Sequence, residues 1–149
     1  MNGRRRFSTL LPLLLITLLE LSAFGDQKSN DCLEYEVDVE LTGTLKRKTF
    51  PGPPEWESVE KGDELLIYWI LHLDKAICVN AWKPGDLINV AENGINRTQI
   101  NVANLIGMYK KYQHLIDRRV KVMGTLYHQH SPYHVTTVVM MARKIESAP

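Results

Sequence analysis

The sequence has few of the short motifs from which catalytic centres are usually built. It contains only two cysteines, and no Cys-x-x-Cys, Gly-x-Ser-x-Gly, His-Glu-x-x-His or phosphate-cradling glycine loop. These patterns carry thiol-redox, serine-hydrolase, zinc-protease and nucleotide chemistry. Their absence makes an enzyme the less favoured class of function, and it directs attention to binding.

The chain also lacks an excess of positive charge. Its net charge is +1 at pH 7, and the first 25 residues carry three arginines and one glutamate, so the remainder has a net charge of −1. Nucleic-acid-binding domains usually carry a basic excess. With 44% apolar and 23% charged residues, the composition is that of an ordinary globular domain. We expect no nucleic-acid partner.

A mostly apolar stretch at the N-terminus, interrupted only by Pro12 and Thr17, has the features of a secretory signal. Arg4, Arg5 and Arg6 precede the leucine-rich residues 10–19, and Ala23 and Gly25 suit a signal-peptidase site. An apolar run of about ten residues is shorter than the roughly 20 that span a bilayer.

We therefore predict a cleaved signal peptide over residues 1–25, a flexible N-terminus over 26–31 and one folded domain over 32–146. The product is expected to be periplasmic or secreted, without stable membrane insertion after cleavage. An uncleaved anchor is the alternative, and the choice between the general secretory and the twin-arginine route stays open.

The two cysteines, Cys32 and Cys78, allow a single intramolecular pairing. Disulfides persist in exported proteins. There is no evident neighbour that would activate either thiol. We therefore predict a structural Cys32–Cys78 bridge.

Alternating apolar and polar residues predict a mainly β structure. Odd-numbered positions from Leu33 to Leu45 are apolar or glycine and are expected to face inward, Val37 among them. The apolar run 65–73 is expected to be a strand covered on both faces. The predicted elements are strands over 33–46, 65–73 with 76–79, 98–102, 119–127 and 134–145, and a helix from Val102 to near Asp117. The order β-β-β-α-β-β predicts an OB-type five-stranded Greek-key barrel, all-β with one short helix.

Several segments together resemble one family. They are Gly43-Thr44-Leu45, Thr49 to Pro54, Lys61-Gly62-Asp63, Tyr68 to Lys75, Ile77-Cys78-Val79, Met108-Tyr109 and Val120 to Tyr127. In order and spacing they are similar to domain of unknown function family 4431, small exported bacterial proteins, over nearly all of the mature chain. The resemblance implies an OB-type fold and a histidine-rich stretch after the second Gly-Thr-Leu. This chain departs from that stretch at Pro132, Tyr133 and Val135.

OB barrels often bind ligands through the loops that join strands one and two and strands four and five. Here these are the proline-rich loop 50–63 and the loop 128–134. Trp56, Tyr127, His130 and Tyr133 are the candidate ligand-binding residues, because aromatic rings offer flat faces to a sugar, a peptide or a protein surface. The predicted function is a non-catalytic module for an unknown envelope ligand or protein. In the alternative interpretation, Trp56 covers the strand 65–73.

Three histidines within seven residues suggest a second possibility. His128, His130 and His134 could supply three nitrogen ligands to zinc or copper, as in a metal-binding protein or a metal-assisted periplasmic hydrolase. The alternative is a polar hairpin whose histidines bond to loop carbonyls, and no other cofactor is expected. A His72–Asp74 or His130–Ser131 dyad is conceivable, although such short spacings arise by chance.

Overall fold

The computed structural model describes residues 31–102 and 105–149. The predicted signal peptide 1–25, and residues 26–30 of the predicted flexible segment, lie outside the described residues. The strands are β1 (Leu33–Glu34), β2 (Asp38–Pro51), β3 (Leu65–Asn80), β4 (Glu92–Val102), β5 (Arg119–His128) and β6 (Val138–Ser147). The helices are α1 (Leu105–Tyr112) and the 3-10 turns η1 (Val59–Lys61) and η2 (Gln113–Leu115).

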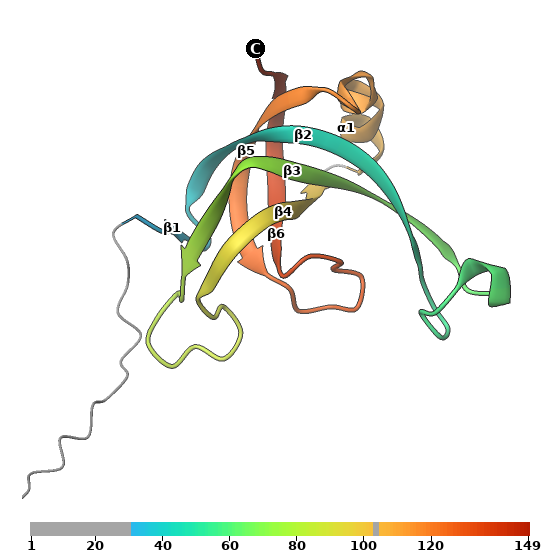
Figure 1. Cartoon of the computed structure of the whole chain (residues 1–149), viewed down its shortest axis with the longest axis horizontal. Helices are drawn as coiled ribbons and strands as arrows, with labels where there is room; N and C mark the ends of the chain where they lie inside the picture. Colours follow the sequence, from blue (N-terminus) through green and yellow to red (C-terminus); the bar gives the residue numbers. More distant parts are fainter. Residues whose placement is uncertain (1–30, 103–104) are drawn as a thin grey trace, which may run out of the picture.

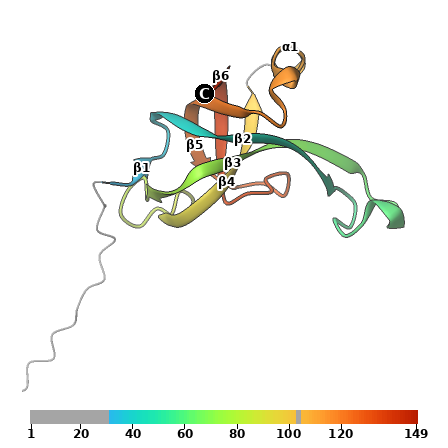
Figure 2. The same ribbon diagram turned by 45° about the horizontal axis from the view of Figure 1, so that its top comes forward.

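Five long strands close into a barrel (Figures 1 and 2). The strand order is β3-β2-β5-β6-β4, and a further β3–β4 pairing joins the two ends. Strands β4 and β6 run parallel, whereas the other four barrel pairs are antiparallel. Since the helix lies between the third and fourth long strands, this is the predicted OB-type topology, which the structure confirms.

The barrel interior is filled by the inward positions of all five strands. Leu45, Leu71, Ile100, Leu126 and Met140 are completely buried at its centre. Glycine occurs in β2 and β5 where a neighbouring strand comes very close. A Cβ atom at Gly43 would lie 2.1 Å from the His72 carbonyl oxygen, and one at Gly124 would lie 2.1 Å from that of Met141. These two positions therefore require glycine for the strands to pack.

The first predicted strand is interrupted. Glu36 has a φ of 60°, which turns the chain between β1 and β2. Because of this turn, Tyr35 is buried in the core whereas Val37 is 53% exposed. The prediction that every odd position from Leu33 faces inward was therefore wrong at Val37, since a left-handed residue breaks the alternation of faces along a strand. Strand β1 instead pairs in parallel with the end of β3.

Strands β2 and β3 continue beyond the barrel as a two-stranded arm (Figure 1). Strand β5 pairs with β2 only over 38–44, and β4 pairs with β3 only from Trp69 onward, so residues 48–51 and 65–68 pair only with each other. Leu65 and Ile67 in this arm are 52% and 41% exposed. The expected cover on both faces of 65–73 is therefore wrong in the arm, where these two side chains remain exposed.

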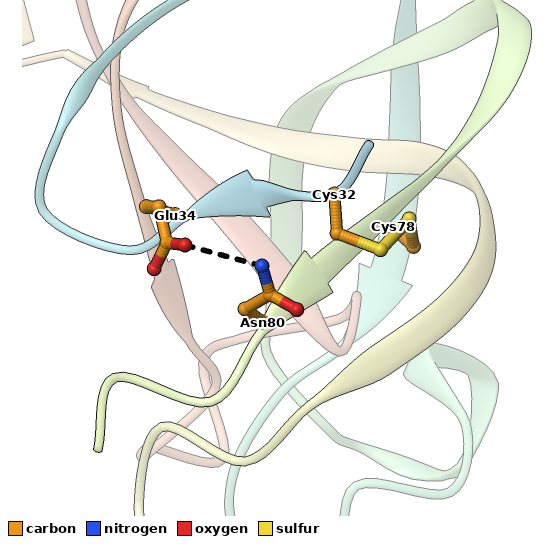
Figure 3. Close-up of a disulfide and its surroundings, with 4 residues drawn as sticks. All are labelled: Cys32, Glu34, Cys78 and Asn80. Carbon is orange, nitrogen blue, oxygen red and sulfur yellow. Dashed lines mark hydrogen bonds between the residues drawn. A yellow bond between two sulfur atoms is a disulfide. The ribbon is translucent and has the colours of Figure 1, made fainter. Parts of the chain in front are cut away.

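One disulfide fastens the start of the domain to the barrel. Cys32 and Cys78 form the predicted bridge, across a sequence separation of 46 (Figure 3). Beside it the Asn80 side chain donates a hydrogen bond of 3.1 Å to the Glu34 carboxylate. Within the described ranges, no helix combines the length and the apolar character needed to cross a bilayer.

Removing the bridge should lower the stability of the barrel. Closing a loop of this length restricts the unfolded chain, so the C32S/C78S variant is expected to lose roughly 4 kcal/mol of the free energy of unfolding. Urea denaturation of the oxidised protein, the reduced protein and the double variant measures this directly. Equal midpoints for all three would show that the bridge contributes nothing to stability.

Candidate functional site

The two predicted binding loops meet at one end of the arm. Loop 52–64 forms the arm's tip, to the right of the barrel in Figure 1, and loop 129–137, which joins β5 to β6, projects from the lower end of the barrel toward it. The rings of Trp56 and Tyr133 touch edge to face, with centroids 5.0 Å apart. Trp56 is half-buried and Tyr133 is 46% exposed. Trp56 thus contacts the opposite loop while part of its surface remains accessible.

A buried carboxylate organises the loop that carries Trp56. Asp63 accepts backbone N–H bonds from Glu55 at 2.9 Å and from Glu57 and Ser58 at 2.7 Å each. These bonds, that of Glu55 first, hold the pKa of Asp63 below its usual range because they stabilise the ionised form. Trp56 sits inside this loop with a left-handed φ of 62°. Asp63 therefore fixes the backbone that presents the indole.

The position of loop 129–137 depends on a buried amide. Gln99, only 1% exposed on β4, accepts the Val135 N–H at 2.8 Å and donates to the Tyr133 carbonyl at 3.3 Å. Its own backbone N–H donates to the Thr136 hydroxyl at 2.8 Å. Gln99 thereby ties the loop to the outer face of the barrel.

Tyr127, His130 and His134 form a cluster on this face. Their ring centroids lie 4.7 to 5.5 Å apart, and the Asn101 amide donates a 2.5 Å hydrogen bond to the Tyr127 hydroxyl. The backbone N–H of His130 donates to Nδ1 of His134 at 3.2 Å. Burial, and then the nearby His130, lower the pKa of His134. His134 is therefore a neutral imidazole that accepts a hydrogen bond from the loop backbone.

His128 lies apart from this cluster. Its Nε2 is 3.0 Å from a Glu92 carboxylate oxygen, and its ring meets the edge of Tyr35. The structure thus brings together His130 and His134 but not the full set of three predicted metal ligands. Nowhere in residues 31–102 and 105–149 do three His, Cys, Asp or Glu side chains converge as they would to hold a metal ion.

The two conceivable catalytic dyads have other partners. Asp74 accepts a 2.9 Å hydrogen bond from Arg119 rather than one from His72. The hydroxyl of Ser131 accepts the Tyr133 N–H, and Nδ1 of His130 lies 3.1 Å from the His128 carbonyl oxygen. Asp74 and Ser131 therefore have hydrogen-bond partners other than His72 and His130.

A cavity of about 240 Å³ lies between the arm and loop 129–137. We call it the cleft. It is lined by Lys48, Thr49 and Phe50 of β2, Ile70 and His72 of β3, Arg97 of β4, and Val135 and Thr136 of the loop. The three basic side chains are exposed, whereas Ile70 is 2% exposed. The cleft therefore combines an apolar floor with a basic edge, a feature that the sequence analysis did not identify.

The environment of the cleft lowers the pKa of His72. Partial desolvation lowers the pKa of His72, and the neighbouring cations Lys48, Arg97 and Lys46 lower it further. Each cause disfavours the charged imidazolium. His72 is therefore neutral at pH 7 and offers both a donor and an acceptor.

Substituting Asp63 should release the loop that carries Trp56. The depressed pKa means that the carboxylate stabilises the loop above about pH 4, and that this stabilisation disappears as pH falls through the folded-state pKa. In D63N we expect faster proteolysis within 53–62 at pH 7 and no acid-induced change in Trp56 fluorescence. Comparable proteolysis of wild type and D63N would contradict this role.

Substituting Gln99 should free the opposite loop. In Q99L the Val135 N–H loses its acceptor, and an unsatisfied buried donor costs about 1–3 kcal/mol. We expect the free energy of unfolding to fall by that amount, and the amides of 131–136 to exchange hydrogen faster. Gln129, exposed on the same loop, provides the control variant Q129L. Unchanged exchange in Q99L would refute the assignment.

Titration of His72 tests the electrostatics of the cleft. Its imidazole resonances should titrate with a midpoint below the ordinary value of about 6.5. K48Q should raise that midpoint, because it removes a neighbouring positive charge, whereas K83Q, on the loop after β3, should not. A midpoint that K48Q leaves unchanged would place Lys48 away from His72.

Comparison with known families supports the expected resemblance. Residues 97–146 match the family described as Domain of unknown function (DUF4431), which confirms that resemblance for the segment from the middle of β4 to β6. The segment includes loop 129–137 and Gln99, whereas the similar motifs before Arg97 lie outside the match. The curated proteins contain no match to the chain.

Proposed function

We propose that this chain, which carries the domain of unknown function over residues 97–146, is an exported, non-catalytic binding module with its ligand site in the cleft. The observation that carries the proposal is the contact between Trp56 and Tyr133. That contact brings the two loops together. The arm that carries loop 52–64 and residues Val135 and Thr136 of loop 129–137 border the same cavity.

The position of the cleft on the barrel supports binding. OB barrels take oligomeric ligands on the outer face of their second and third strands, between the loops that follow the first and fourth strands. The second and third long strands of this barrel are β3, which carries Ile70 and His72, and β4, which carries Arg97. The corresponding loops are 52–64 and 129–137. A larger hollow of about 500 Å³ beside α1 is lined by no residue of either loop.

Aromatic side chains on the two loops beside the cleft offer a further means of recognition. Trp56 and Tyr133 retain accessible surface, and such rings bury a large area at low entropic cost when a ligand packs on them. Tyr127 and His130 extend the aromatic surface along the outer face of the barrel. A sugar ring, a peptide or a protein loop would suit this surface.

The polar contacts favour binding over catalysis. Asp74 and Ser131 hold other partners, and His134 accepts a backbone hydrogen bond. General acid–base work needs a positioned group that is free to exchange a proton with a substrate. In the pairs proposed from the sequence, Asp74 bonds to Arg119 and Ser131 to the Tyr133 N–H, which supports a binding role.

The Cys32–Cys78 bridge supports an extracytoplasmic location. Disulfides form and persist in the periplasm and outside the cell, whereas cytosolic thiols are kept reduced. Together with the leader-like residues 1–25, this favours the periplasm or secretion as the destination, and an envelope component as the ligand.

NMR titration tests the site. The ¹⁵N-labelled protein is titrated with chitotetraose and with short peptides, and shifts are expected at Trp56, Tyr133 and the cleft. Replacing either aromatic with alanine should weaken binding about tenfold, equivalent to roughly 1.4 kcal/mol. Trp82, 48% exposed on the loop after β3, provides the control W82A, which should bind normally. Shifts confined to the neighbourhood of Trp82 would overturn the proposal.

A further inference from the structure

We infer that the cleft takes a carboxylate attached to an apolar body, such as the C-terminal aliphatic residue of a peptide or a free acid of the same size. The inference rests on the proposed function and specifies its ligand. It is carried by the charge, the floor and the volume of the cavity.

The charge comes from three adjacent strands. Lys48 on β2, His72 on β3 and Arg97 on β4 line one edge of the cavity, and His72 and Arg97 are directly paired in the β3–β4 ladder. No aspartate or glutamate is among the lining residues. An anionic group would therefore meet two positive charges and no negative one among the lining side chains.

Among residues 31–102 and 105–149, Lys48 and Arg97 lack the carboxylate partners that two nearby cations have. Lys46 pairs with Asp117 at 3.0 Å, and Arg119 pairs with Asp74 at 2.8 Å. In contrast, Lys48 and Arg97 form no ion pair with any residue in the part of the chain that the structure describes. Two unpaired cations at one edge of a cavity leave a positive field that a ligand carboxylate would neutralise.

The floor of the cleft is apolar. Ile70 is almost fully buried there, and Phe50 and Val135 face it from the arm and from loop 129–137. Inorganic phosphate would leave this surface without a partner, whereas an aliphatic side chain would cover it. The floor therefore selects among anions for those with an apolar body.

The volume limits the size of the bound group. Sites for drug-sized ligands are about 300–1,000 Å³. The cleft, at about 240 Å³, is smaller and suits a unit no larger than one amino-acid residue. A longer ligand would place its terminal unit here and extend toward Trp56 and Tyr133.

The donor groups of Arg97, Lys48 and His72 determine how a ligand carboxylate would be held. The planar guanidinium of Arg97 can hold a carboxylate through two parallel N–H bonds, whereas Lys48 acts as a point charge. The neutral imidazole of His72 adds one further donor. Because both permanent charges are exposed, the attraction should weaken as salt is added.

Matched ligands test the inference by NMR titration of the full folded domain. N-acetyl-leucine is compared with its uncharged amide, and the peptide Ala-Ala-Leu with its C-terminal amide. Each acid should bind at least tenfold more tightly than its amide, with shifts at Ile70, His72 and Arg97. If Ala-Ala-Leu binds more tightly than N-acetyl-leucine, the ligand is the end of a peptide. If the two acids bind equally, the ligand is a small organic acid. Either result supports the inference.

The variant K48Q/R97Q should abolish the preference for acids, whereas K83Q, which removes an exposed lysine outside the cleft, should keep it. Both side chains are exposed, and an unchanged amide spectrum will show that the variant folds.

If the wild-type protein binds each acid and its amide with equal affinity, the inference of a carboxylate ligand is overturned, while the proposed function stays intact. Inorganic phosphate bound as tightly as the acids would also overturn it, by showing an unselective anion site. If no ligand of either titration shifts the cleft, the proposed function itself fails.

Discussion

The closing ladder between β3 and β4 is the constraint on which the rest of the molecule depends. Without it the five long strands would form an open sheet, whereas with it they enclose Leu71 and Ile100. The same ladder sets His72 beside Arg97 on the outer surface. Closure thus builds the core on one side of these strands and the basic edge of the cleft on the other.

Two buried polar side chains then position the loops over this surface. Asp63 gathers backbone N–H groups of loop 52–64, and Gln99 fastens loop 129–137 to β4. Buried polar groups are costly unless all their hydrogen bonds are made, so each loop has one strongly preferred arrangement. The contact between Trp56 and Tyr133 joins the two arrangements.

Local patterns in the sequence were sufficient to predict the topology and the bridge. The alternation in β5 and the even cysteine count are properties of neighbouring residues or of composition, and both predictions are confirmed. The error at Val37 came from the left-handed backbone at Glu36, which no apolar pattern reveals. The exposed Leu65 and Ile67 could not be foreseen either, because β4 pairs with β3 only from Trp69 onward.

The candidate site was predictable in place but not in detail. Loop order in a barrel indicated Trp56 and Tyr133, which do meet. The partnership of His128 with Glu92 spans 36 residues, and nothing near either residue signals it. Gln99 lies in a weakly alternating stretch like many surface glutamines. Its burial follows only from the way loop 129–137 folds back.

The central claim is that the two loops meet over the closed barrel and form one binding face. Nuclear Overhauser contacts in the unliganded protein test it most directly. We expect cross-peaks between the indole protons of Trp56 and the ring protons of Tyr133, and we expect D63N to lose them. An indole whose only contacts lie within its own loop 52–64 would contradict it.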